Sequence, residues 1–96
     1  MRTQPGKRDE VVPRLLRGLD GLPAAGCLSY VVSTCQDDPD LIWVTEVWES
    51  AEHHDASLRL PEVQAAITAT MPLLTGEFTR QELAVAGGLG LAPVPR

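Results

Sequence analysis

The stretch from Leu41 to Trp48 constrains the fold most, because it is rich in Val, Ile, Thr and Trp and contains neither Gly nor Pro. That composition is typical of a β-strand. Because side chains alternate across a strand, the two faces carry Ile42, Val44, Glu46 and Trp48 on one side, and Leu41, Trp43, Thr45 and Val47 on the other. Both faces are largely apolar. The strand is therefore predicted to be covered twice, by helices on one face and by something such as a second subunit on the other.

Length and charge exclude several classes of protein. A chain of 96 residues is long enough for one domain with a modest core. Its net charge of −5 argues against nucleic acid or an anionic membrane surface as a partner. No apolar run approaches the roughly 20 residues of a membrane span, and the first ten residues lack the apolar part of a signal peptide. We expect a cytoplasmic protein.

The two cysteines, Cys27 and Cys35, fall eight residues apart in one predicted strand. At about 3.3 Å per residue they are separated by roughly 26 Å, far beyond the reach of a disulfide. They are predicted to be free thiols unless another chain supplies a partner. Neither lies near a His or a second Cys at metal-ligand spacing, so no metal site is expected.

Helical and strand periodicities alternate along the chain. Residues 8–19 predict an amphipathic helix with Arg14 and Arg17 outward, in which Pro13 lies close to the first turn or causes a kink. Pro61 suits the first position of a second helical segment after the break at Leu60. The predicted elements, in order, are a strand fragment at 1–4, a helix at 8–19, strands at 27–35 and 41–48, helical segments at 51–58 and from 61, and a strand at 77–85.

This order is the βαββαβ pattern of an α+β, ferredoxin-like protomer, an antiparallel sheet with two helices on one face. The first strand normally lies in the middle of such a sheet, and residues 1–4 are short for it. Either this strand is short or residues have been lost at the start; in the second case a chain extended upstream should be more stable. We expect a single domain over residues 1–91 and a flexible tail at 92–96.

The five-residue turn at 36–40 sets the register of the central hairpin. If Cys35 pairs with Leu41, then Tyr30 lies opposite Glu46 and Leu28 lies opposite Trp48, all on one face. The hairpin therefore gathers a phenol, a carboxylate and an indole.

The chain resembles the antibiotic biosynthesis monooxygenase family over roughly residues 5–91. The resemblance rests on an ordered set of short motifs, PGK, PAAGCLSY, WVTEVWES, LPEVQAAI and MPLLTG. It implies a ferredoxin-like protomer whose open sheet face packs on a second subunit, forming a dimeric α+β barrel. It also implies a pocket between the sheet and the helices of each protomer. For some members it implies oxygenation of a quinol-like aromatic compound without metal, flavin or haem, so no cofactor is expected.

The resemblance extends to individual residues only in part. Trp48 matches the tryptophan that ends the third strand in much of the family, and His54 with Asp55 matches a pair at the start of the following helix. The chain contains no Asn, which the haem-degrading and polyketide-oxidising branches employ. The pocket tryptophan and the haem-ligating histidine of the haem-degrading branch fall at Ser57 and Ile67, and the histidine that many members carry on this helix also falls at Ser57. The resemblance therefore does not imply haem degradation.

Five residues are candidates for a site: His54, Glu46, Tyr30, Trp48 and Leu58. His54 lies one turn before Leu58 and points the same way, so it is either a structural histidine at a core edge or a base for a phenol, since imidazole has an ordinary pKa of about 6.5. Glu46 on an apolar face needs a partner, of which the Tyr30 hydroxyl or a histidine is the simplest. Trp48 is either core or interface, or a flat wall for an aromatic ligand.

Two functions from different classes follow from these residues and the resemblance. The first is a cofactor-independent monooxygenase that acts on a quinol-like or polycyclic aromatic hydroxyl compound with O2, with His54 and Glu46 as catalytic candidates. The second is a non-catalytic dimer of the same fold that binds a small aromatic ligand or serves as a stress-related accessory protein. Both predict a homodimer.

Overall fold

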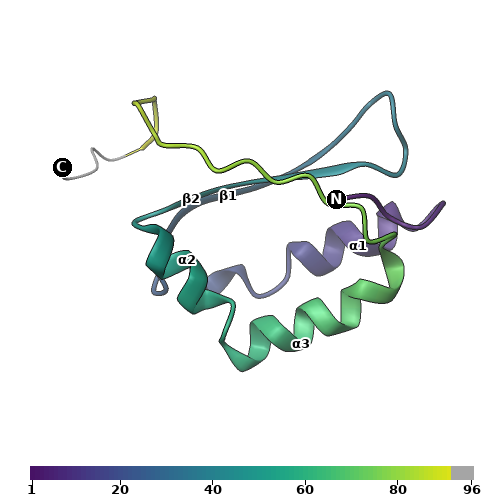
Figure 1. Cartoon of the computed structure of the whole chain (residues 1–96), viewed down its shortest axis with the longest axis horizontal. Helices are drawn as coiled ribbons and strands as arrows, with labels where there is room; N and C mark the ends of the chain where they lie inside the picture. The colour runs from purple at the N-terminus through teal and green to yellow at the C-terminus, as the bar shows by residue number, and fades with distance from the viewer. Residues whose placement is uncertain (92–96) are drawn as a thin grey trace.

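Two antiparallel strands and three α-helices form the described part of the chain, residues 1–91 of a computed structural model. All three helices lie on the same side of the strands (Figure 1). The architecture is α+β, as predicted. Its regular elements are α1 (Arg8–Leu15), the 3-10 turn η1 (Leu19–Gly21), β1 (Cys27–Thr34), β2 (Ile42–Trp48), α2 (Ala51–Ser57), α3 (Pro61–Thr70) and the 3-10 turn η2 (Met71–Leu73).

The hairpin of β1 and β2 follows the predicted register along most of its length. Tyr30 pairs with Glu46, and the Cys35 N–H donates to the Leu41 carbonyl at 3.3 Å. The prediction that Leu28 lies opposite Trp48 was wrong, because the register shifts between Cys27 and Ser29 and Cys27 pairs with Trp48. Such a bulge inserts an extra residue into one strand, which the loop length cannot reveal.

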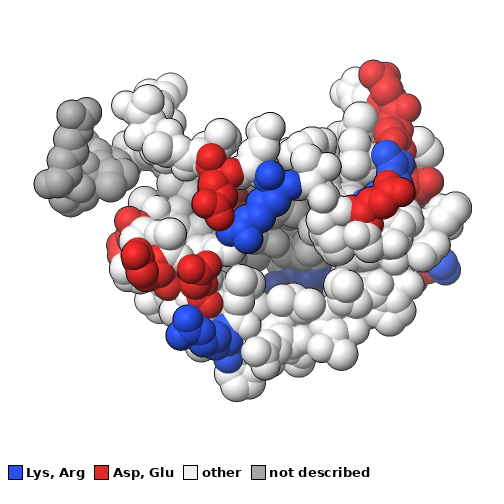
Figure 2. All heavy atoms as spheres, in the orientation of Figure 1, with Lys and Arg blue, Asp and Glu red and all other residues white. Residues whose placement is uncertain are grey.

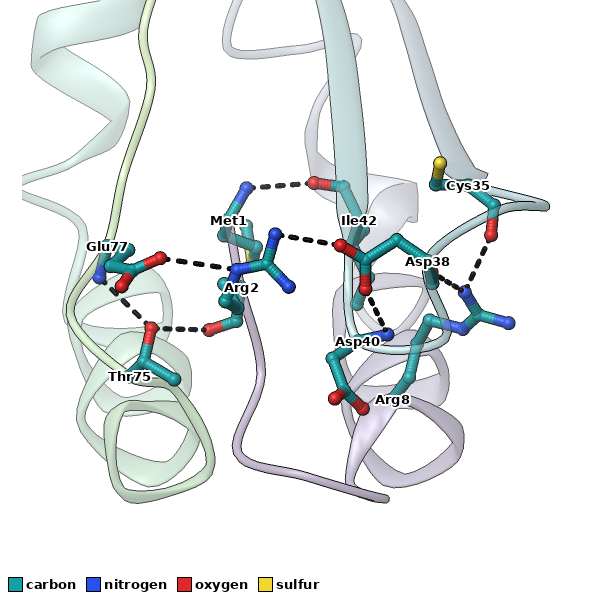
Figure 3. Close-up of polar contacts among 9 residues, drawn as sticks. All are labelled: Met1, Arg2, Arg8, Cys35, Asp38, Asp40, Ile42, Thr75 and Glu77. Atoms are coloured by element: carbon teal, nitrogen blue, oxygen red, sulfur yellow. Dashed lines mark hydrogen bonds and ion pairs between the residues drawn. The ribbon is translucent and has the colours of Figure 1, made fainter.

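Residues 1–4 lie between β2 and the chain that follows η2, as Figure 3 shows. They form only isolated bridges, Arg2 with Leu41 and Thr3 with Leu74. The Met1 ammonium donates to the Ile42 carbonyl at 2.8 Å, and the Ile42 N–H donates to the Met1 carbonyl at 3.0 Å. The first strand is therefore central, as the pattern predicts, and short.

Side chains reinforce this end of the sheet (Figure 3). Arg2 forms ion pairs with Asp38 at 2.8 Å and with Glu77 at 3.2 Å. The Arg8 guanidinium donates to the main-chain carbonyls of Cys35 and Asp38 at 3.0 and 2.8 Å. The start of α1, the hairpin turn and the chain after η2 are thereby joined by charged hydrogen bonds.

Helix α1 is shorter than predicted, ending at Leu15 instead of Leu19. Gly18 follows with a φ of 70°, a left-handed conformation that ends the helical path. Pro13 lies well inside the helix rather than near its first turn. The 3-10 turn η1 lies between this point and β1.

The buried core is small and lies under the Ile42 end of the sheet. Val11 of α1 and Ile42 of β2 have no exposed surface, and Leu74 is 8% exposed. Complete burial of such a side chain contributes roughly 1.5–3 kcal/mol. Helix α3 begins at Pro61 as predicted, because a proline at the first position gives up no helical hydrogen bond.

The strand predicted at 77–85 is absent. Residues 78–88 have no regular secondary structure, although they run along the sheet in Figure 1. A strand forms only where a neighbour offers main-chain partners, and residues 78–85 make no main-chain hydrogen bond within residues 1–91. The tail predicted at 92–96 lies outside the described residues. No helix among residues 1–91 is long and apolar enough to cross a membrane.

Candidate functional site

A cavity of about 640 Å³ lies between the sheet and the helices. Figure 2 shows the hollow on this face, with basic atoms recessed inside it. Tyr30 and Glu46 line it from the strands, Trp48 lines it from the end of β2, and His54 and Leu58 line it from α2 and the residue after it. The structure thus brings all five sequence-predicted site residues to one cavity, on the sheet face that the helices cover.

The Trp48 and His54 rings are in aromatic contact. Their ring centroids lie 5.4 Å apart with an interplanar angle of 76°, an edge-to-face arrangement. The His54 side chain is 22% exposed, and its Nδ1 lies 3.4 Å from Asp55 Oδ1. The imidazole is therefore held between an indole on the cavity side and a carboxylate on the solvent side.

Glu46 is bound differently from the prediction. Its Oε1 accepts a hydrogen bond from the Trp48 indole N–H at 3.2 Å, and neither the Tyr30 hydroxyl nor a histidine is its partner. The residue is exposed, so the carboxylate keeps access to water. Residues two apart on a strand lie on the same face, and this spacing in the sequence is the signal that could have identified the pair.

Tyr30 lies half-buried opposite Glu46. Burial raises the pKa of its phenol, and the nearby Glu46 carboxylate and Cys27 raise it further. Tyr30 is therefore a neutral phenol at neutral pH, able to donate one hydrogen bond into the cavity. Burial also raises the pKa of the Cys27 thiol, so that free cysteine is unreactive.

The start of α2 fixes the position of His54. Ser50 caps the helix in an extended conformation, and its Oγ accepts a hydrogen bond from the His53 N–H at 3.1 Å. The His53 ring is exposed and lies over Gly26, where a Cβ would come within 2.7 Å of His53 Cδ2. The His53 side chain thus faces solvent, and His54, the next residue on the helix, faces the cavity.

The opposite wall comes from α3 and η2. Residues at helical spacing, most of them apolar, line the cavity from this side: Val63, Ala66, Ile67, Thr70, Met71 and Leu74. Two lining hydroxyls are satisfied by their own helices, Ser57 Oγ by the His54 carbonyl at 2.6 Å and Thr70 Oγ1 by the Ala66 carbonyl at 2.8 Å. Because both hydroxyls donate within their own helices, this wall presents mainly apolar surface to the cavity.

Sequence reasoning missed two basic residues at this cavity. Arg14 and Arg17 were expected to point away from the helix's apolar side, but both line the cavity together with Leu15 and Leu19. Arg14 lies in the last turn of α1, whereas Arg17 lies in the segment after the helix, because α1 ends at Leu15. A charge of opposite sign to a deprotonated aromatic hydroxyl is thus available at the cavity.

The outer face of the sheet has a different character. Val31 and Trp43 are 49% and 44% exposed there, and Leu28 in the bulge is 43% exposed. Apolar side chains on a strand face without a covering layer indicate a contact surface. Among residues 1–91, no group of three or more His, Cys, Asp or Glu side chains is arranged to hold a metal ion.

Comparison with known proteins decides the family. The family profile described as antibiotic biosynthesis monooxygenase, ABM, matches residues 1–69. This chain belongs to the ABM family. Its structure is similar to the crystal structure of a "putative Antibiotic biosynthesis monooxygenase" from Chloroflexus aurantiacus J-10-fl, with 47% sequence identity and a TM-score of 0.86. The match covers 96% of this ABM chain and 92% of the other. No protein with a curated description matches significantly. A ferredoxin-like fold and a general monooxygenase-like function follow from this membership.

Proposed function

We propose that this ABM protein oxygenates a small aromatic hydroxyl compound of the quinol type with O2, in the cavity beside Trp48. The observation that supports this most is the grouping of an indole, a phenol, an imidazole and a carboxylate at one end of an otherwise apolar wall. Such a wall with a few polar groups at one end suits a flat ligand with a hydroxyl at its edge.

The proposed base is His54. The Asp55 carboxylate beside Nδ1 favours the tautomer with its hydrogen on Nδ1, which leaves Nε2 as the acceptor. Nε2 takes the proton of the aromatic hydroxyl, while Trp48 holds the ring edge and Leu58 packs on its apolar side. Tyr30 donates a hydrogen bond to the resulting anion, and Glu46 positions Trp48 through the indole N–H.

The electrons come from the substrate. The deprotonated aromatic hydroxyl passes one electron to O2, and the resulting aryloxyl radical, whose unpaired electron is shared with the ring carbons, combines with superoxide at a ring carbon as a peroxide. Cleavage of the O–O bond leaves one oxygen on the ring as a carbonyl, and the other leaves as water with the proton from His54 and the hydrogen lost from the ring carbon. The sum is a quinol plus O2 giving a hydroxyquinone plus water, or an anthrone plus O2 giving an anthraquinone plus water.

The test is oxygen consumption by the pure protein with a reduced naphthoquinol or anthrone, with ¹⁸O2 to follow the oxygen into the product. We expect consumption above the uncatalysed rate and one labelled oxygen in the hydroxynaphthoquinone, or in the anthraquinone when an anthrone is used. His54→Ala should lower the rate by roughly 10²–10⁴-fold, the usual contribution of a positioned base.

His53→Ala is the matched control, because His53 is the adjacent histidine and does not line the cavity. Its rate should stay near that of the unaltered protein. Equal losses in the two variants, or no consumption above background by the unaltered protein, would reject the proposal.

The alternative is a dimer that binds an aromatic compound without turning it over. One observation favours it: within residues 1–91, His54, Glu46 and Tyr30 make no hydrogen bond to one another. The acid and base groups are thus not linked in advance. Tight binding of the naphthoquinol, measured by calorimetry without oxygen consumption, would support this alternative.

A homodimer that joins the outer sheet faces forms part of the proposal. Val31 and Trp43 are its central contacts, since both are apolar and exposed on that face. Sedimentation should give a dimer at micromolar concentration, and Trp43→Glu should give a monomer. Thr45→Ser, on the same face, is the mild control. A monomeric unaltered protein would remove this part of the proposal.

A further inference from the structure

Arg14 and Arg17 line the candidate cavity from the end of α1 and the segment after it. The Arg17 N–H donates to the Arg14 carbonyl at 3.4 Å, so one further turn follows the last residue of the helix. Residues three apart on such a turn lie on the same side. Both guanidinium groups therefore reach the cavity from one side, and Figure 2 shows basic atoms recessed in the hollow of this face.

Neither guanidinium has an acceptor of its own in the protein. Within residues 1–91, Arg14 and Arg17 make no side-chain hydrogen bond and no ion pair. Other basic side chains of the same range do have protein acceptors: Arg2, Lys7, Arg8 and Arg80. Two like charges three residues apart repel each other, so this pair opposes folding unless an anion lies beside it.

The carboxylates that line the same cavity interact with other groups. Glu46 accepts a hydrogen bond from the Trp48 indole N–H. Glu62 is exposed in the first turn of α3, where a negative charge interacts favourably with the helix dipole. Neither forms an ion pair with Arg14 or Arg17 among the described residues. Two unpaired positive charges thus line the cavity of a protein whose net charge is −5.

We propose that Arg14 and Arg17 bind a carboxylate of the ligand, which makes the substrate an aromatic hydroxy acid. The inference rests on the proposed function, because it adds a second anchoring point to the substrate whose hydroxyl lies beside His54. A guanidinium presents its N–H groups as a fork that matches the two oxygens of a carboxylate.

A permanent anion suits this pair better than the aromatic hydroxyl does. The hydroxyl becomes an anion only after His54 takes its proton, whereas a carboxylate is already charged when it reaches the cavity. An acidic protein repels an anionic ligand in general, so positive groups are needed where such a ligand binds.

The two anchoring points lie apart from each other. Neither arginine is bonded to Glu46, the carboxylate beside Trp48, within residues 1–91. The hydroxyl and the carboxylate of the ligand are therefore expected on different parts of the ring system. The cavity of about 640 Å³ is large enough for a ligand of two rings with a substituent at each end.

The probes are 6-hydroxy-2-naphthoate and its neutral carboxamide, 6-hydroxy-2-naphthamide, which have nearly the same shape and differ in charge. Calorimetry in the absence of O2 measures binding without turnover. We expect the acid to bind about tenfold more tightly than the amide at low salt, as charged hydrogen bonds to a carboxylate predict. This preference should decrease as salt is added, because Arg17 is exposed and its charge is screened.

The variant that tests the pair carries Arg14→Gln and Arg17→Gln together. It should raise the Kd of the acid to near that of the amide, and an unchanged Kd for the amide would show that the cavity is intact. Arg59→Gln with Arg80→Gln is the matched control, since it removes the same charge at exposed residues that do not line the cavity. Glu62→Gln should act in the opposite direction and tighten binding of the acid roughly two- to threefold, because it removes a like charge.

Three results would overturn the proposal. One is an equal Kd for acid and amide in the unaltered protein, or no binding of the acid at millimolar concentration. Another is a preference for the acid that persists in the variant lacking Arg14 and Arg17. The third is an equal loss of preference in the Arg59 and Arg80 variant, which would mean that the overall field of the protein is the cause.

These outcomes are separate from those of the oxygen-consumption test. If a naphthoquinol without a carboxylate is oxygenated and the acid binds no better than the amide, the carboxylate site is rejected and the proposed function stands. If the acid is preferred through Arg14 and Arg17 but no quinol is oxygenated, the proposed function fails and the carboxylate site stands.

Discussion

The two ends of β2 differ in how they are held. At the Ile42 end the strand is paired on both sides, its side chain is fully buried, and charged groups join three segments around it. At the Trp48 end the strand is paired on one side only, and its side chains line a cavity. The Ile42 end of β2 is thus part of the core, and the Trp48 end lines the candidate site. The difference lies in the neighbour, because the first strand reaches only one end.

The largest effect should come from Ile42→Ala. Removing a fully buried isoleucine leaves a cavity in a small core and should lower the free energy of unfolding by about 2–5 kcal/mol. Val44→Ala, two residues toward the open end, should cost about 1 kcal/mol, because Val44 is only partly buried and borders space. Urea unfolding measures both. Equal costs would mean that the two ends are packed alike.

Gly26→Ala should come next, because the open end depends on a close approach of backbone to side chain. Gly26 has a φ of 100°, and a Cβ there would meet His53 Cδ2 at 2.7 Å. We expect a loss of about 1–3 kcal/mol in the free energy of unfolding.

Gly21→Ala is the matched control for Gly26→Ala, since a Cβ at Gly21 meets nothing within 4 Å. Repeating Gly26→Ala in a His53→Ala background should recover the part of the stability loss that is due to the clash with the His53 ring. The part that is due to the positive φ at residue 26 should remain. A double variant that recovers nothing would show that contact with His53 is not the cause.

A smaller effect concerns the two tryptophans, which lie on opposite faces of β2 and are the only tryptophans in the chain. Quenching of intrinsic fluorescence by an added naphthoquinone should be lost in Trp48→Ala and retained in Trp43→Ala. Calorimetry should show a Kd at least about tenfold higher for Trp48→Ala, which corresponds to a loss of about 1.4 kcal/mol in binding free energy. If Trp43→Ala loses the quenching instead, the ligand binds on the outer face.

The smallest effect is a pH dependence at the closed end. The hydrogen bond from Arg2 holds the pKa of Asp38 below its usual value of 3.8, and the Asp40 N–H adds to this. A depressed carboxyl pKa contributes stability that is present above the unfolded value and is lost as pH falls through the folded value. The melting temperature should therefore fall below about pH 4. Asp38→Asn should flatten that fall, and Asp37→Asn, at an exposed neighbour, should not.

Local rules predicted the parts of the fold that depend on near neighbours. The alternation of side chains along β2 predicted which residues share each face of the strand. The length of the turn before β2 predicted the pairing of Tyr30 with Glu46. Pro61 gave the start of α3. These features depend on side-chain direction and loop geometry, which a sequence carries directly.

The errors depend on partners that are distant in the sequence or on local irregularity. Residues 77–85 have the composition of a strand, but within residues 1–91 only Glu77 bonds to a neighbouring main chain, and a strand cannot form from propensity alone. The bulge at Leu28 displaced the pairing with Trp48 by one residue. For the candidate site, the gathering of the residues followed from the register. The position of Arg17 depended on where α1 ends, and Arg14 lines the cavity from within that helix.

The hydroxyls of Ser57 and Thr70 bear on which isomers this cavity would accept. Each donates to a carbonyl of its own helix, so neither needs a partner in the cavity. A polar substituent of the ligand placed against that wall would lose its hydrogen bonds to water and gain none from Ser57 or Thr70. A substituent near Tyr30 would instead accept a hydrogen bond from the phenol. The affinity of the cavity for ring-substituted naphthols should therefore depend on the position of the hydroxyl rather than on overall size. The product should be a single regioisomer.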